Sequence, residues 1–150
     1  MGDIFDIHEL TNYEKDLVKL ANDTMPKESK KFIKKEAGKL NTKNKSAYKS
    51  KGIEEKTGNL LRGFKAGKAY KFDGAWSARA YNNSPHAHLL DKGYMWKPHK
   101  KVAKGQKNKQ TGAEKFIPGF HFMDDAAAAF EGTYYDDIND FIDQVLAKGL

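Results

Sequence analysis

The sequence contains no cysteine and no long apolar run, and each absence excludes a class of protein. Without cysteine there are no disulfides, no thiolate metal sites and no cysteine nucleophile. No stretch approaches the roughly 20 apolar residues that a membrane-spanning helix needs. Residues 1–9 are acidic and mixed, which is not the pattern of a signal peptide. We therefore expect a soluble protein that is made in the cytoplasm and contacts no membrane.

Length and composition indicate a single domain with a polar surface. The 150 residues are 39% hydrophobic and 31% charged, so we expect some segments to be covered only in an assembly. We divide the domain into N-terminal helices with a lysine-rich loop (1–56), a sheet with a short helix (57–95), an exposed basic loop (96–115) and C-terminal helices (116–150).

The net charge of +7 is distributed in blocks. Lysines dominate residues 26–56 and 97–115, whereas carboxylates dominate residues 124–143. This segregation suits two partners, a polyanion and a basic neighbour, and it is equally typical of faces that are only solvated.

Apolar residues at helical spacing predict two N-terminal helices. The first covers roughly residues 1–24 and the second residues 26–40, with the boundary at Pro26. Residues 41–52 are rich in Asn, Ser and Lys, which predicts a flexible loop.

The C-terminal part predicts two further helices. Residues 119–130 contain an alanine run that allows close helix packing. Gly132 and Thr133 interrupt the pattern, and apolar residues then recur at helical spacing over 134–146.

The middle of the chain predicts a small antiparallel sheet of three to four strands. Short runs with aromatic and apolar residues occur at 60–66, 68–72 and 75–81. Asp73 and Gly74, between two of these runs, are typical of a hairpin turn. The fold class is therefore α+β, with the sheet packed by the N-terminal and C-terminal helices.

The sheet is followed by a predicted short helix and a long loop. Ser84 as N-cap and Pro85 in the first turn begin a helix over 86–92, which Gly93 ends. Residues 96–115 are rich in Lys, Gly and Gln with little apolar content, which indicates an exposed basic loop.

The histidines are the first candidates for chemistry. In a strand, His86 and His88 would share one face and suit a metal, but in the predicted helix they diverge. Asp91, His99 and His121 could complete a site only through tertiary contacts. The alternative is structural, with one imidazole packed against the sheet and the other bonded locally, and we expect no metal and no cofactor.

Other catalytic patterns are weak. Ser77 and Ser84 lie in no nucleophile elbow, and Asp124 and Asp125 are adjacent, so on a helix they point in different directions. No glycine spacing matches a phosphate-binding loop. We therefore expect a protein that is not an enzyme.

The basic loop is a candidate for nucleic-acid contact. Trp96 lies among cationic residues, as aromatic side chains do in single-strand binders. A weaker prediction is that the loop contacts only the phosphates of duplex DNA, without regard to sequence.

A series of short motifs spans about two thirds of the chain, and the structural signature among them is Thr57, Gly58, Leu60, Asn82, Ala87, Asp91, Gly93 and Gly119. The order of these motifs resembles that of a protein family from tailed bacteriophages, the small neck or tail-completion proteins that join head and tail. Two departures are Asp91, where the family usually has glutamate, and the lysine-dense second helix.

The resemblance implies a structural protein of the virion that forms a ring, most simply a hexamer, between the head–tail connector and the tail terminator or tail-tube protein. The basic loop would face the DNA channel or an acidic neighbour, and the residues concerned are Lys97, His99, Lys100, Lys101, Lys104, Lys107 and Lys109. The alternatives are a tail terminator that caps the tube and a small non-specific nucleic-acid-binding protein.

Overall fold

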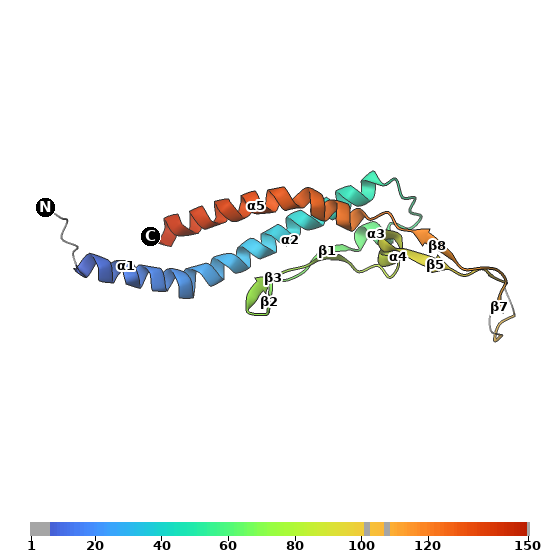
Figure 1. Ribbon diagram of the computed structural model, residues 1–150, viewed down its shortest axis with the longest axis horizontal. Coiled ribbons are helices and arrows are strands. Elements are labelled where there is room, and N and C mark those ends of the chain that lie inside the picture. The colour runs from blue at the N-terminus through green and yellow to red at the C-terminus, as the bar shows by residue number, and fades with distance from the viewer. Residues whose placement is uncertain (1–6, 101–102, 107–108, 150) are drawn as a thin grey trace.

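The computed structural model describes residues 7–100, 103–106 and 109–149. Its α+β architecture is the predicted one. Two long helices lie side by side, and two β-hairpins run beside and beyond them, which gives an elongated molecule (Figure 1).

The first long helix is continuous where the sequence predicted a boundary. It comprises α1 (Ile7–Lys19), the π-helical turn η1 (Leu20–Thr24) and α2 (Met25–Ser50). Pro26 lies in the first turn of α2, and the Met25 amide before it donates to the Leu20 carbonyl across the wider π turn. This turn accommodates the proline, which has no N–H and crowds the preceding turn of a regular helix.

The predicted loop at 41–52 is wrong, because α2 continues to Ser50. Asn44 and Tyr48 are buried in this segment. Its inner face therefore packs on the rest of the protein, and this packing outweighs the low helix propensity of Asn and Ser.

The second long helix, α5 (Phe122–Gly149), also lacks the predicted break at Gly132 and Thr133. It runs antiparallel to α2 and packs along it (Figure 1). Phe32 and Phe141 stack between them with ring centroids 4.5 Å apart. A helical glycine costs about 1 kcal/mol relative to alanine, and the apolar contacts on both sides of Gly132 outweigh this cost.

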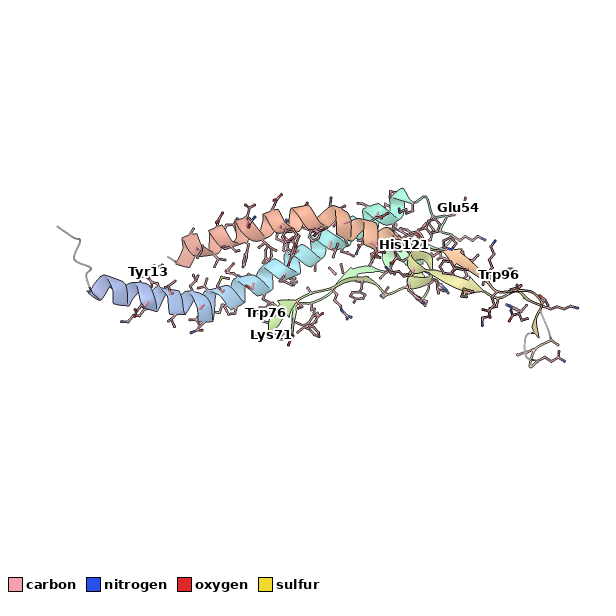
Figure 2. The ribbon with its side chains drawn as sticks, in the orientation of Figure 1. Tyr13, Glu54, Lys71, Trp76, Trp96 and His121 are labelled. Carbon is pink, nitrogen blue, oxygen red and sulfur yellow. The ribbon has the colours of Figure 1, made fainter. Side chains whose placement is uncertain are left out.

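Residues 64–82 form one hairpin, called the inner hairpin below. Its strands are β1 (Phe64–Ala66), β2 (Tyr70–Phe72), β3 (Ala75–Ser77) and β4 (Ala80–Asn82). β1 pairs with β4 and β2 with β3, and the predicted turn at Asp73 and Gly74 is confirmed, with φ of +49° and +77°. Trp76 faces α2, where the Lys30 ammonium lies 5.3 Å from its ring centroid (Figure 2).

In the middle of the chain, the structure differs from the prediction in two details. Residues 59–62 form a short helix, α3 (Asn59–Arg62), where a strand was predicted. The strands form two-stranded ladders rather than one sheet of three to four strands. The short helix before Gly93 is confirmed as α4 (Ala87–Lys92), although His86 rather than Ser84 occupies its N-cap position.

Four strands between Gly93 and Pro118 form the second hairpin, and residues 93–118 are called the arm below. Its strands are β5 (Gly93–Trp96), β6 (His99–Lys100), β7 (Lys109–Gln110) and β8 (Lys115–Pro118). The sequence predicted a loop at 96–115, but within it Trp96 pairs with Lys115, His99 with Gln110 and Lys100 with Lys109. The arm and the inner hairpin point in opposite directions (Figure 1).

The hydrophobic core is small and lies where α3, α4 and the ends of the two long helices meet. Its buried residues are Tyr48, Leu60, Phe64, Ala87 and Phe122. The rings of Tyr48, Phe64 and Phe122 lie 5.4–5.9 Å apart in tilted and edge-to-face contacts, which are favourable aromatic geometries. No helix in the part of the chain described by the structure combines the length and apolarity needed to cross a membrane.

Candidate functional site: a buried junction and a basic arm

The structural signature gathers around the core and forms a joint between three parts of the chain. Leu60, Ala87 and Asp91 are buried there. Gly93 begins the arm, and Gly119 ends it just before α5. We call residues 82–93 and 119–123 the junction, because both hairpins and α5 start or end within it.

Asp91 is the polar centre of the junction. Its side chain is 7% exposed, and its Oδ1 accepts a hydrogen bond from the Met123 amide at 3.0 Å. Its carbonyl accepts a second one from the His121 amide at 2.9 Å. Met123 lies in the first turn of α5, so Asp91 satisfies an unpaired helix amide and places a negative charge at the positive end of the helix dipole.

Two glycines allow the backbone segments of the junction to touch. Gly93 has φ of +93°, and a Cβ on it would lie 2.5 Å from the Ile117 oxygen. A Cβ on Gly119 would lie 2.6 Å from the Asp91 carbonyl carbon and from the Gly93 nitrogen. Any larger residue at either position therefore separates the base of the arm from α4.

Asn82 joins the inner hairpin to α3. Its side-chain amide donates to the Leu60 carbonyl at 2.8 Å, and its oxygen accepts from the Ser84 amide at 2.8 Å. Thr57 and Gly58 start α3, where the Thr57 hydroxyl oxygen lies 3.4 Å from the Asn59 amide. The eight signature residues are thus positioning and packing residues.

Glu55 also belongs to this region, and sequence reasoning missed it. Its carboxylate accepts hydrogen bonds from the amides of Leu60 and Leu61 and from the Tyr48 hydroxyl at 3.0 Å. Burial, and then the hydrogen bond to Glu55, raise the pKa of Tyr48 to about 12. No sequence pattern links these two residues, although a tyrosine in an apolar core requires a polar partner.

Lysines pair with several of the C-terminal carboxylates within the chain. The Lys92 ammonium lies 3.0 Å from both oxygens of Asp124. This hydrogen bond raises the pKa of Lys92 and lowers that of Asp124. The Lys51 ammonium also forms an ion pair with Asp125. These contacts connect the junction and α2 to the start of α5.

A buried carboxylate sits between the two long helices. Glu36 is 4% exposed, and burial is the main cause that raises its pKa. Lys39 lies 3.5 Å from it and also binds Asp137 of α5. Hydrogen bonding to Lys39 lowers the pKa of Asp137. The group is an ion-pair contact between helices.

The predicted basic residues lie on the arm, away from the core. Lys97, His99, Lys100 and Lys104 are exposed there, and Lys97 pairs with Glu114 at 2.9 Å. Lys109 lies on β7. The predictions for Lys101 and Lys107 fall outside the described residues. Exposed apolar side chains accompany these cations, and they are Tyr94, Met95, Trp96 and Phe116 (Figure 2 labels Trp96).

The candidate catalytic and metal residues are not brought together. Within residues 7–100, 103–106 and 109–149, no three His, Asp or Glu side chains lie close enough to hold a metal ion. The Ser77 hydroxyl contacts the Ala75 carbonyl at 3.4 Å rather than a base. His121 lies 3.4 Å from Asp124, as a surface contact at the start of α5.

Comparisons of the chain with protein-family models, with curated proteins and with solved structures find no match. The resemblance to phage neck proteins therefore stays a prediction that rests on the order of the motifs.

The glycine contacts predict opposite effects for two alanine substitutions. Gly119→Ala is expected to lower the free energy of unfolding by about 1–3 kcal/mol, since its Cβ overlaps backbone atoms of residues 91–93. Gly38→Ala, in open space within α2, is the matched control and is expected to raise it by about 0.4–1 kcal/mol. Urea denaturation followed by circular dichroism measures both, and equal effects would contradict the assigned contact.

The raised pKa of Tyr48 predicts a loss of stability in alkali. The folded state keeps the Tyr48 proton up to about pH 12, whereas the unfolded state loses it near pH 10. The contribution is therefore complete below pH 10, and the free energy of unfolding falls by about 1.4 kcal/mol per pH unit between 10 and 12. Because the raised pKa of Lys92 gives both proteins a common fall in this range, denaturation should show a steeper slope in the protein than in Tyr48→Phe, by about 1.4 kcal/mol per pH unit, and identical slopes would refute the assignment.

Proposed function

We propose that the chain is a structural protein of a tailed phage or of a phage-derived particle, where it forms a ring between the head connector and the tail. The proposed ring is a hexamer, and the proposed neighbours are the connector on one side and the tail terminator or tail-tube protein on the other. The protein acts by contact and is not an enzyme.

The observation that carries this proposal is the amount of apolar surface on elements that reach away from the core. On the arm, Trp96 is 49% and Phe116 is 55% exposed, and on α1 Val18 is 58% exposed. A two-stranded ribbon is only marginally stable in water on its own. Exposed apolar surface on such a ribbon is typical of a part that another protein covers.

The fold also suits a component that joins larger parts. The junction holds the base of the arm against α4 and α5 through Asp91, Gly93 and Gly119, so the arm starts from a fixed position. The two long helices extend in the other direction (Figure 1). An elongated subunit of this kind can contact different neighbours at its two ends.

A nucleic-acid-binding function is the second candidate, and the cations of the arm favour it. Lys97, Lys100, Lys104 and Lys115 are exposed beside Trp96, which combines phosphate contacts with a stacking surface. In the neck proposal the same residues face packaged DNA or an acidic neighbour. A tail terminator remains the closest alternative among virion proteins.

Deleting the gene from a phage that encodes the protein is expected to leave filled heads and separate tails, because the ring that joins them is missing. Electron microscopy of the purified particles measures this outcome. The wild-type gene supplied in trans is the control and should restore joined particles with the protein in the neck. The doubly substituted gene Trp96→Ser, Phe116→Ser should restore few of them.

Joined particles in the absence of the gene would contradict the proposal. The nucleic-acid-binding function would then be favoured, and a DNA-binding measurement tests it. The isolated chain should bind duplex DNA with an affinity that falls steeply with salt, because each neutralised phosphate releases counterions.

A further inference from the structure

The arm exposes apolar side chains on both faces of its ribbon. Met95 and Phe116 are opposite one another in the ladder, and so are Tyr94 and Ile117. Neighbouring positions along a strand point to opposite faces. Exposed side chains therefore occupy both faces, with Met95 and Phe116 on one and Tyr94 and Trp96 on the other.

A second apolar surface lies along the exposed side of α5, and at its edge Ile142 also lines the groove between α5 and α2. Tyr135, Ile142 and Leu146 are 58%, 43% and 42% exposed. Their spacing of seven and four residues places them on one stripe of the helix. The remaining members are small or polar and also exposed, and we call the whole set the α5 stripe: Ala128, Gly132, Tyr135, Asn139, Ile142 and Leu146.

The two surfaces carry opposite charge. Asp136 and Asp143 border the α5 stripe, whereas Asp140, one turn from Asp136, lines the groove between α5 and α2 together with Lys31 and Lys35. None of the three forms an ion pair with another described residue. On the arm, Lys100, Lys104 and Lys115 are exposed, and they too form no ion pair within the described part of the chain.

We propose that the arm of one copy docks on the α5 stripe of a second copy. The apolar side chains of the arm cover Tyr135, Ile142 and Leu146, and its lysines face the carboxylates that border them. The proposal rests on the proposed ring and names the contact that builds it.

The geometry makes this contact intermolecular. The arm projects from one end of the molecule, and the C-terminal half of α5 lies toward the other end (Figure 1). One chain therefore cannot join its own arm to its own stripe. Two different surfaces that bind each other from copy to copy form a heterologous contact, which closes into a ring when the rotation between copies allows it.

The same observations favour a protein partner over DNA for the base of the arm. Met95 and Phe116 occupy one ribbon face with no cation between them, and a phosphate backbone gives such a face nothing to bind. The carboxylates near the α5 stripe would repel DNA, whereas they complement the lysines of another copy.

The absence of cysteine allows a direct test with single cysteines in the full chain. Lys100→Cys labels the arm and Asn139→Cys labels the α5 stripe. Mild oxidation of the mixed variants is expected to give a disulfide-linked dimer that contains one of each. The matched control replaces Asn139→Cys by Ser46→Cys on the exposed side of α2, and this mixture should give about tenfold less dimer.

Charge reversal tests the polar part of the contact. Lys100→Glu with Lys104→Glu should weaken self-association by about tenfold or more, and so should Asp136→Lys with Asp143→Lys. A chain that carries all four substitutions should regain association, because the pairs are restored with reversed sign. Sedimentation velocity measures association, and circular dichroism verifies that each variant is folded.

Three outcomes would overturn the inference. The first is crosslinking only between two arms or only between two α5 helices, and the second is no crosslink in the mixture at any protein concentration tested. The third is a fourfold variant that does not regain self-association. Protection of the Lys100→Cys thiol by duplex DNA, together with no crosslink to α5, would assign the arm to nucleic acid. The neck function is tested separately. If the crosslink forms but particles that lack the gene are joined normally, only the proposed neck function is refuted. If those particles fail to join but no crosslink forms, only this contact is refuted.

Discussion

The contact between the backbone at Asp91–Gly93 and the backbone at Gly119–Met123 is the constraint on which the rest of the structure depends. The two segments are separated by the whole arm in sequence, and they touch because both glycines lack a Cβ. The Asp91 carboxylate then supplies the start of α5 with a hydrogen-bond acceptor from a different helix. Together these contacts set the position from which the arm leaves and the direction in which α5 returns along α2. The aromatic core of Tyr48, Phe64 and Phe122 closes the same region from the other side.

A small core with long extensions has a physical consequence for the function. Aromatic contacts and buried hydrogen bonds stabilise the centre, whereas the outer parts of α1, α5 and the arm keep apolar side chains in water. Burial of apolar surface contributes a favourable free energy of roughly 25 cal/mol per Å². Covering these surfaces in an assembly would therefore stabilise the assembly relative to separate chains. The charges can direct such an assembly, since exposed lysines lie on the arm as well as on α2, and Asp136 and Asp143 on the outer flank of α5 form no ion pair with another described residue.

The sequence predicted the features that depend on local rules and missed those that depend on distant contacts. The α+β class, the turn at Asp73 and Gly74, and the helix that ends at Gly93 follow from turn chemistry and periodicity. Pro26 and Gly132 suggested helix ends, but a π turn absorbs the first and packing against α2 outweighs the second. The arm was predicted as a loop because its pairing joins Met95 to Phe116 across a lysine-rich segment. Glu55 lies in no sequence motif that indicates its hydrogen bonds. The order of the motifs identified the signature residues, but it did not predict the contacts that these residues make.

Hydrogen–deuterium exchange of the full chain, measured in dilute solution and after self-association, tests the central claim most directly. The claim is that a rigid junction carries an arm that only another copy covers. It predicts that the amides of Phe120, His121 and Met123 are among the slowest to exchange in both states, because their hydrogen bonds break only when the core opens. It also predicts that amides in β5 and β8 exchange quickly in the monomer and slowly in the assembly. Junction amides that exchange as fast as the arm, or an arm whose exchange is unchanged by assembly, would contradict the account.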